Sequence, residues 1–439
     1  MATTGATARR RTWSNWAGTA TASPADVVAP ASVEELQRDV ARAAAAGLRV
    51  KALGSGHSFT PIAVTDGLAI RPDRLRGIVS ADPATGTATV LAGTPLHELG
   101  PALWEHGLAM PNLGDIDVQT LAGALATGTH GTGRRLGGLG TQVAGMQLVL
   151  ADGTLYDCPA DVVPAAAIGL GALGVVATVT LRCVPAFLLR ARERPAGFDE
   201  VLRDPATFDR FTAAHDHAEL YWFPHTRRLL TKRNDRADGP VRPLPGWRRR
   251  FDDEFLSNTV FGWTNQVCAA RPSWIPRVNA VAARALGARE FTDRSYRVFA
   301  TPRRVLFRET EYAVPRDAVP AVIGEIEDWL RRSGENVAFP IEVRVAAADD
   351  VWLSTAFGRD SGYVAVHQYA GCDHTRYFDA AESILRDAGG RPHWGKMHSL
   401  GADDLAALYP RFDDFRALRD RLDPGRTFTN PYLRRVLGD

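Results

Sequence analysis

Two glycine-rich loops, each enclosing one histidine, constrain the fold of this chain most strongly. The first reads Gly54-Ser55-Gly56-His57-Ser58, and the second runs from Ala126 to Gly133 as Ala-Thr-Gly-Thr-His-Gly-Thr-Gly. Glycine loops bring the backbone close to a ligand and aim N–H groups at an anion. One such loop is more typical of a turn, but two of them with several hydroxyl side chains favour a site for a long, phosphate-bearing cofactor. The histidines are unusual for such a site, because a phosphate needs no imidazole.

Length and charge limit the possible classes of protein. A chain of 439 residues is too long for one simple core and predicts two domains. Apolar residues make up 45% and charged residues 23%, as in ordinary globular proteins. The formal net charge of +2 argues against a nucleic acid or an anionic membrane as the main partner. The arginines at 248–250 are followed directly by acidic residues, which indicates a mixed surface.

Cysteine spacing and apolar runs indicate the compartment. None of the four cysteines forms a Cys-x-x-Cys pair, so we expect no metal site and no disulfide framework. Arg9-Arg10-Arg11 is not followed by an apolar stretch, so we expect no secretory or twin-arginine signal. The longest uncharged run, 162–181, is broken by a proline and three glycines and is predicted to lie in the core. We therefore expect a cytoplasmic protein without a stable membrane span.

The N-terminal third alternates between strand and helix patterns. Ser32 and Glu35 form a capping box ahead of a helix with Val33, Leu36 and Val40 on its buried face. The other expected elements are a strand at 48–53 that leads into the first glycine loop, a strand at 87–91, a helix at 95–106 and a hairpin of 147–150 with 154–156.

A third glycine motif, at 169–174, matches the Gly-x-Gly-x-x-Gly fingerprint of dinucleotide sites, and Glu193 follows near the usual distance. That fingerprint requires a strand before it and a helix after it. Here residues 175–181 are β-branched and predict a strand after the motif. We therefore reject this segment as a dinucleotide site of that kind.

The second half predicts a different kind of domain. From Glu309 the pattern indicates a strand to 314, a helix at 318–332, strands at 339–345 and 363–369, and a helix at 379–388. Two helices beside an antiparallel sheet are typical of an α+β domain. The pattern leaves open whether the residues after about 390 return to the first domain.

Three later groups combine residues that can carry chemistry. Alternation places Glu342 and Arg344 on one face of a strand, as either a solvated ion pair or a catalytic pair. It also places His367 and Tyr369 together, although a lone strand histidine is usually structural. The third group, 391–398, holds His393, Trp394, Lys396 and His398. A lysine that supplies positive charge beside a buried cofactor fits this group better than a metal site does.

Together, these motifs resemble the aldonolactone oxidoreductases of the vanillyl-alcohol oxidase flavoprotein superfamily. That group includes L-gulono-1,4-lactone and D-arabinono-1,4-lactone oxidases and the bacterial alditol oxidases. The resemblance rests on both glycine loops, Gln119-Thr120-Leu121-Ala122-Gly123, Glu342-Val343-Arg344, His393-Trp394-Gly395-Lys396 and the terminal 430–438 segment, in that order. It spans nearly the whole chain but is weak between about 190 and 305.

The resemblance implies a two-domain α+β flavoprotein. A PCMH-type FAD-binding domain would span 1–188, a cap domain with an antiparallel sheet would span 189–388, and residues 389–439 would return to the FAD domain. The first loop would hold the pyrophosphate, and His57 matches the position that bears a covalent histidyl bond to flavin in several relatives. The residues assigned to FAD are Gly54, Ser55, Gly56, His57, Ser58, Thr120, Gly123, Thr127, Thr129, His130, Gly131, Gly133, Val175, Val176 and Lys396. Those assigned to catalysis are Glu342, Arg344, His367 and Lys396.

The expected activity is oxidation of a sugar 1,4-lactone by hydride transfer to flavin N5, with oxygen or another acceptor reoxidising the flavin. Lys396 and Arg344 would stabilise developing negative charge, Glu342 would orient Arg344, and His367 would bind or deprotonate the hydroxyl. An alditol oxidase that acts on xylitol or sorbitol shares these signatures and stays an alternative. A non-catalytic flavin- or sugar-binding protein is the alternative of another class. The sequence does not distinguish an oxidase from a dehydrogenase, and it does not indicate the oligomeric state.

Overall fold

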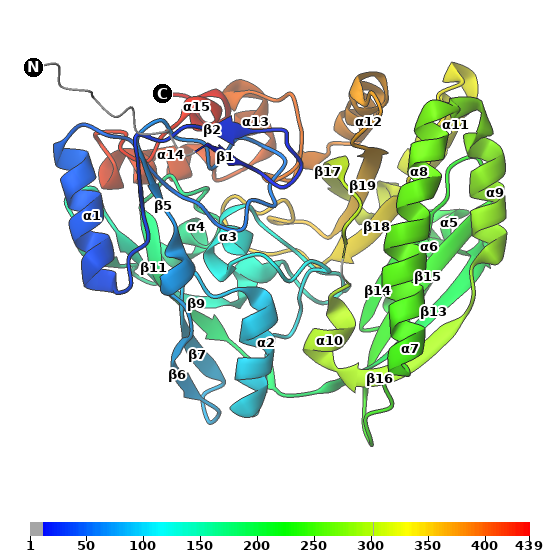
Figure 1. Cartoon of the computed structure of the whole chain (residues 1–439), viewed down its shortest axis with the longest axis horizontal. Coiled ribbons are helices and arrows are strands. Elements are labelled where there is room, and N and C mark those ends of the chain that lie inside the picture. The colour runs from blue at the N-terminus through cyan, green and yellow to red at the C-terminus, as the bar shows by residue number, and fades with distance from the viewer. Residues whose placement is uncertain (1–11, 302) are drawn as a thin grey trace, which may run out of the picture.

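The chain forms two lobes that lie side by side, one built from both ends of the sequence and one from its middle (Figure 1). The computed structural model describes residues 12–301 and 303–439. The arginines at 9–11, on which the expectation of no signal rests, lie outside the described residues. Mixed helices and antiparallel sheets in two lobes confirm the expected α+β architecture.

The N-terminal lobe begins with a small parallel sheet of order β3-β5-β4, packed against α1. Helix α1 (Val33–Ala45) starts at Ser32, whose side chain accepts the N–H of Glu35 at 3.2 Å. The strands of this region are β1 (Trp13–Ser14), β2 (Thr21–Ala22), β3 (Asp26–Val28), β4 (Val50–Ala52) and β5 (Leu68–Ile70). Strand β4 leads directly into the first glycine loop, as expected.

A five-stranded antiparallel sheet of order β10-β9-β11-β7-β6 completes the core of this lobe. Its strands are β6 (Ile78–Asp82), β7 (Thr87–Leu91), β9 (Val143–Val149), β10 (Leu155–Asp157) and β11 (Val175–Arg182). The remaining elements are η1 (Pro72–Arg74), α2 (Leu96–Glu105), β8 (Leu108–Ala109), α3 (Leu121–Ala126), η2 (Leu139–Gln142), α4 (Val163–Ala166) and β12 (Val184–Pro185). Helix α3 starts at Thr120, whose hydroxyl accepts the N–H of Gly123 at 3.2 Å, and it ends at the second glycine loop.

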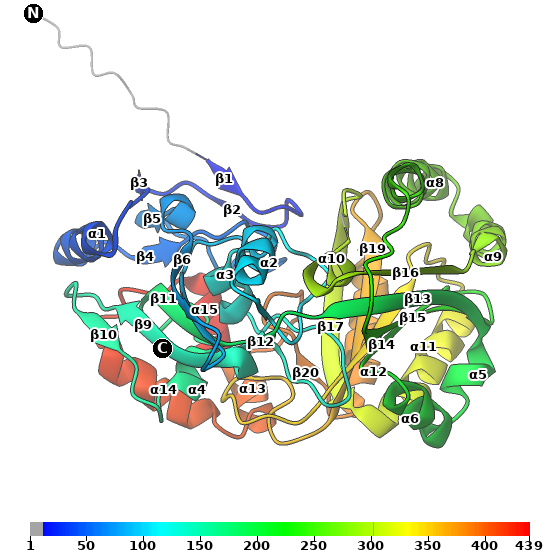
Figure 2. The same cartoon turned by 90° about the horizontal axis from the view of Figure 1, so that it is seen from below.

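The second lobe is built on an eight-stranded antiparallel sheet of order β16-β13-β15-β14-β18-β19-β17-β20. Its strands are β13 (Leu188–Gly197), β14 (His217–Trp222), β15 (Arg228–Ala237), β16 (Arg289–Arg294), β17 (Phe307–Pro315), β18 (Ile341–Ala346), β19 (Ser361–Tyr369) and β20 (Arg391–Pro392). Figure 2 shows helices on both sides of this sheet. On one side lie α5 (Phe198–Leu202), α6 (Pro205–Ala213), η5 (Arg316–Ala318), α11 (Val319–Ser333) and α12 (Thr375–Asp387).

A helical hairpin lies on the other side of the sheet, where α8 and α9 stand apart from α11 and α6 (Figure 2). It consists of α7 (Gly246–Arg249), the π-helix η3 (Arg250–Val260), α8 (Phe261–Ala270), η4 (Pro272–Trp274) and α9 (Ile275–Ala285). The short helix α10 (Ser295–Phe299) follows β16 and contacts α2 of the first lobe.

The C-terminal segment lies beside the N-terminal lobe (Figure 1). It forms α13 (Ala402–Leu408), α14 (Phe412–Leu422) and α15 (Pro431–Leu437). The side-chain amide of Asn430 donates to the carbonyls of Pro61, Ile62 and Val64 at 3.1, 2.9 and 2.9 Å. Phe428 is buried against the core around α1.

The run at 162–181 lies mostly in the core, as expected, and the motif at 169–174 is followed by strand β11. Glu193 forms an ion pair with Arg289 at 2.6 Å in the second lobe. In the described part of the chain, no helix is long and apolar enough to cross a membrane.

Candidate active site

The two glycine loops meet at one cavity in the N-terminal lobe. Its wall includes the whole first loop, Thr120, Gly123, Thr127, Val175 and Val176. A Cβ on Gly54 would lie 3.0 Å from the Thr120 hydroxyl, and Gly56 has φ +74° and lies against the Trp13 side chain. The two glycines therefore let the loop pack closely against Thr120 and Trp13, which holds its backbone at the wall of the cavity.

The glycine motif at 169–174 also lines this cavity, through Gly169, Leu170, Gly171, Leu173 and Gly174. The fingerprint's strand–loop–helix order is absent, so its rejection as that type of dinucleotide site agrees with the structure. However, the sequence argument missed that the segment belongs to the same cavity. Leu170, Gly171 and Gly174 have positive φ angles, so the backbone of this segment is an irregular loop and not part of a helix or strand.

A second cavity lies between the lobes and adjoins the first. Both cavities are lined by His57, Ser58, Gln119 and Thr127. The second cavity also receives charged and aromatic side chains from both lobes, namely Trp16, Phe59, Asp115, His130, Phe307, Glu311, Arg344, His393 and Lys396. Thr129 lines this cavity as well. We call the first cavity the glycine-walled cavity and the second the inter-lobe chamber. His57 lies where the two meet.

Two of the glycines assigned to FAD, both in the second glycine loop, pack against protein atoms instead of facing a cavity. A Cβ on Gly131 would lie 2.3 Å from Asn112 Oδ1 and 2.4 Å from the Leu113 carbonyl oxygen. Gly133 donates its N–H to the Val345 carbonyl at 2.8 Å and so joins the second loop to β18. Neither glycine lines these two cavities.

The His57 ring has an environment that keeps it neutral. It stacks on Trp16 with ring centroids 5.3 Å apart and planes inclined by 21°. Burial and the nearby charge of Lys396 lower the pKa of His57 to about 4. Among the described residues, none forms a hydrogen bond with this ring, so its nitrogens are available to a ligand.

Lys396 is paired with a buried carboxylate that the sequence argument did not identify. Its amine contacts Glu309, and His367 Nε2 lies 3.4 Å from the other oxygen of the same carboxylate. Burial by itself would lower the pKa of Lys396, but Glu309 and Glu311 raise it above the usual range. Lys396 and His367 in turn lower the pKa of Glu309 to about 2, against the effect of burial. The lysine is therefore a fixed cation at the cavity wall.

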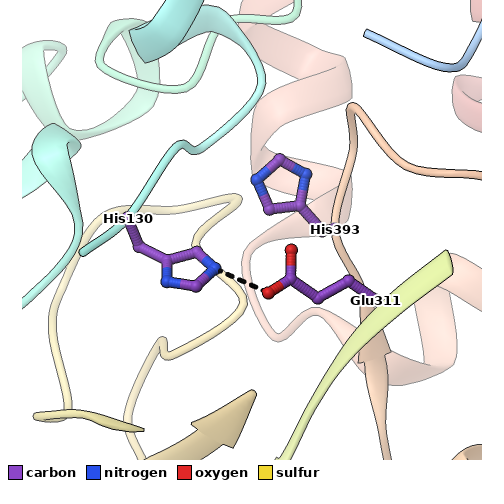
Figure 3. Close-up of side chains that lie close together, drawn as sticks. All are labelled: His130, Glu311 and His393. Carbon is purple, nitrogen blue, oxygen red and sulfur yellow. Dashed lines mark hydrogen bonds and ion pairs between the residues drawn. The ribbon is translucent and has the colours of Figure 1, made fainter. Parts of the chain in front are cut away.

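His130, Glu311 and His393 form a second buried cluster at the same cavity (Figure 3). His130 Nε2 lies 3.2 Å from Glu311, and its Nδ1 lies 2.9 Å from the Gly131 carbonyl oxygen. The ring also stacks on Tyr363 at 3.5 Å. Burial by itself would raise the pKa of Glu311, but His130 and Lys396 hold it well below the usual range, so this carboxylate is ionised.

The donor set of this cluster fits hydrogen bonding better than a cation site. His393 Nδ1 accepts the N–H of Gly395 at 3.0 Å, which leaves the proton of the neutral ring on Nε2. Burial lowers the pKa of His393 most strongly, and the charge of Lys396 lowers it further. The pKa falls to about 3, although the nearby Glu311 carboxylate acts to raise it. A metal-bound histidine needs a free lone pair on the coordinating nitrogen, which this tautomer does not offer at Nε2.

Arg344 lies at the centre of a third charged cluster. Its guanidinium contacts Glu342, lies 3.1 Å from Asp115 and donates to Glu219 at 3.0 Å. Burial by itself would lower the pKa of Arg344, but these carboxylates raise it well above the usual range. Burial raises the pKa of Glu342, and Arg344 opposes that effect. The arginine is a permanent cation held by side chains from β14, β18 and the segment around Asp115.

The structure separates the four residues assigned to catalysis into two groups. Arg344 and Lys396 line the inter-lobe chamber. Glu342 and His367 do not line it: Glu342 contacts Arg344, and His367 lies beside Glu309, the partner of Lys396. Tyr369, expected beside His367, lines a separate groove next to α8. The sequence argument missed Glu309, Glu311, Asp115 and Glu219. Glu309 and Glu311 alternate along β17, so the same argument that paired Glu342 with Arg344 would have paired them.

Comparisons with known proteins agree with this architecture. Residues 179–436 match the family described as D-arabinono-1,4-lactone oxidase, and residues 24–159 match an FAD binding domain. The chain is 43% identical to an L-gulono-1,4-lactone dehydrogenase of Mycobacterium tuberculosis, over 97% of this chain and 99% of that protein. It is 35% identical to an L-gulonolactone oxidase of Bos taurus, over 96% and 97% of the two chains.

The crystal structure of a cholesterol oxidase from B. sterolicum superposes with a TM-score of 0.83 at 20% identity, covering 97% of this chain and 96% of the other. At that identity the likeness concerns the fold, and it confirms the expected two-domain arrangement. The match to an FAD binding domain covers the first glycine loop, the second loop and most of the glycine-walled cavity.

Proposed function

The chain belongs to the D-arabinono-1,4-lactone oxidase family, and on this basis we propose that it oxidises a hydroxyl group of a sugar 1,4-lactone. It is an FAD-dependent oxidoreductase that acts on CH–OH donors. One observation carries the proposal for this chain: two cations, the buried Arg344 and the partly buried Lys396, line a chamber that joins the glycine-walled cavity at His57.

The glycine-walled cavity fits FAD because the first loop and the segment 169–174 both lie at its wall, where glycine-rich backbone can offer N–H groups to a pyrophosphate. We assign the pyrophosphate to the first loop and the flavin to the end of the cavity at His57, Ser58, Gln119 and Thr127. The FAD domain would comprise 1–188 and 389–439, with 189–388 as the substrate domain. The contacts of Asn430 with residues 61–64 support this division.

We further propose that His57 bears a covalent bond to the flavin. The ring lies at the junction of the two cavities, and a pKa of about 4 leaves it neutral at physiological pH. A neutral imidazole has a lone pair that can form such a bond. The stacked Trp16 ring fixes the orientation of His57.

When bound, FAD supplies a hydride acceptor at flavin N5. The substrate carbon next to the lactone carbonyl would lose the hydride while its hydroxyl loses a proton, and the ketone product would tautomerise to an ascorbate-type enediol. Arg344 and Lys396 stabilise the negative charge that develops on the oxygen, because ion pairs with neighbouring carboxylates hold both cations in place at the chamber wall. Glu342 and His367 hold these cations through Arg344 and Glu309.

The proton acceptor that faces the chamber is the ionised carboxylate of Glu311, oriented by His130, rather than His367. Glu311 and His130 line the chamber, whereas His367 Nδ1 is bonded to the Pro340 carbonyl at 3.1 Å and its Nε2 faces Glu309. We therefore assign the hydroxyl proton to Glu311 and the orientation of Lys396, through Glu309, to His367.

A panel of substrates tests the proposal. L-gulono-1,4-lactone and D-arabinono-1,4-lactone should give a higher kcat/KM than xylitol or sorbitol, and NAD(P) should have no effect. Each substrate is assayed with oxygen and with an artificial electron acceptor, so the panel also identifies the acceptor class. Turnover of polyols without turnover of lactones would replace the proposal with an alditol oxidase.

A further inference from the structure

The helical hairpin 246–285 exposes a concentration of large apolar side chains that the proposed function does not use. Most of the large apolar side chains that are exposed in the described part of the chain belong to this segment. Trp247 is 72% exposed, Trp263 63% and Val281 66%. Isolated exposed apolar residues are ordinary, but a group of them on one element marks an interaction surface.

The first helical segment of the hairpin, formed by α7, η3 and α8, places these side chains along one side. Trp247, Phe251, Phe255, Trp263 and Val267 follow one another at steps of four or eight residues. A four-residue step overshoots one turn of an α-helix, which has 3.6 residues. It falls short of one turn in the wider π-helix, so the π-helical stretch η3 offsets the drift of its α-helical neighbours. The stacked rings of Phe251 and Phe255, 5.6 Å apart, confirm that these two lie on the same side.

The opposite side of the hairpin anchors it to the protein. Cys268, Ile275 and Ala283 are buried, and the Asn279 side chain donates to the carbonyls of Pro224 and Val337 at 3.0 and 2.9 Å. Phe261 packs edge-on against Phe339 at 4.8 Å. The exposed side chains are therefore presented by a fixed element at the edge of the molecule, where α8 and α9 project from the sheet (Figure 2).

Arginines accompany the exposed rings. The hairpin 246–285 contains six arginines, all exposed, against three acidic residues, one of which, Asp252, lies 3.5 Å from Arg248. The segment is thus strongly basic, although the whole chain has a formal charge of only +2. Two copies that met through this surface would repel each other, whereas an anionic surface would attract it.

Helices that combine Trp and Phe with arginine lie in the interface of an anionic bilayer, with the rings among the lipid headgroups. The groove beside the helix, lined by Arg250, Phe255, Trp263, Leu306 and Tyr369, has the same combination of charge and apolar surface. We propose that the hairpin 246–285 docks the protein on the surface of an anionic lipid membrane without crossing it. This inference rests on exposed residues outside the active site and is independent of the proposed substrate.

The test is cosedimentation of the purified holoenzyme with vesicles of phosphatidylcholine, with and without about one-third phosphatidylglycerol. The wild type should bind the anionic vesicles, and binding should weaken as salt screens the arginines. The triple variant Trp247→Ser/Phe251→Ser/Trp263→Ser should bind at least tenfold more weakly. Replacing Arg248 and Arg249 by Gln should also weaken binding, by roughly fivefold for each arginine near an anionic surface.

Val79→Ser is the matched control, because Val79 is 59% exposed on β6 of the other lobe. This variant should bind like the wild type. All variants should retain flavin and turnover with a soluble acceptor, which shows that they are folded. The proposal is overturned if the wild type does not bind anionic vesicles, or if the triple variant binds them equally. It is also overturned if the wild type forms a dimer that the triple variant cannot form, because the surface is then a self-interface.

Discussion

At the scale of single residues, charge and burial decide what each side chain can do. His57 is neutral because burial disfavours its charged form and Lys396 repels a proton from it, which together lower its pKa to about 4. We predict that acid precipitation leaves flavin fluorescence with the wild-type protein and that His57→Ala releases it. In apoprotein reconstituted with FAD, bond formation should persist well below pH 6.5 and fail near pH 4, where the ring becomes protonated. Flavin appearing wholly in the supernatant of the wild type would refute the covalent bond.

Lys396 is expected to act through its charge. Lys396→Met should lower kcat by roughly 10²-fold or more while flavin stays bound, as loss of a preorganised electrostatic group does. It should also lower the free energy of unfolding by about 3 kcal/mol, because Glu309 then loses its main counter-charge while buried.

The double variant Lys396→Met/Glu309→Gln separates these two effects. Removing the uncompensated carboxylate should recover most of the stability measured by thermal unfolding, while turnover stays low. Lys396→Arg, which retains the charge, is the control for catalysis. Near-normal turnover of Lys396→Met would show that the lysine does not act on the reacting atoms.

The residues that sequence alone could identify are those within a readable local pattern. Alternation paired Glu342 with Arg344, and the structure shows their contact. It could not show that Asp115 and Glu219, from distant segments, share the same guanidinium, because that depends on how the lobes meet. Tyr369 shows the same limit: it lies on the strand that carries His367, but it faces a different groove.

At the scale of elements, strong local signals predicted the structure well. The cap at Ser32, the strand at 87–91 and the helix at 95–106 all appear within a few residues of their expected bounds. The helical hairpin at 246–285 was not predicted, although its apolar residues recur at steps of four, because that pattern does not show that this side of the helix faces away from the core.

The second glycine loop offers a test at this scale. Gly131→Ala should lower Tm by several degrees and reduce the FAD content of the purified protein, since its Cβ would meet Asn112 and the backbone of Leu113. Gly138→Ala is the matched control, because its Cβ would make only ordinary contacts, at 3.5 Å from His130 Cβ. Equal Tm and FAD content in the two variants would show that Gly131 does not position the loop.

At the scale of the whole molecule, the chain must cross between the lobes and return to build the site. The FAD cavity uses the N-terminal loops together with Phe428, and the chamber adds Glu311 from β17 and Lys396 from the segment after β20. Sequence pattern predicted two domains but not this joint wall, because contacts between residues hundreds of positions apart leave no local periodicity.

The central claim is that a lactone bound in the inter-lobe chamber delivers a hydride to a flavin held at His57. The most direct measurement is the yellow absorbance of the purified holoenzyme mixed without oxygen with L-gulono-1,4-lactone, and separately with xylitol. We predict rapid bleaching with the lactone, slower bleaching with xylitol, and bleaching slowed by at least 10²-fold in Arg344→Ala despite retained flavin. Flavin that stays oxidised with the lactone, or bleaches faster with xylitol, would contradict the account.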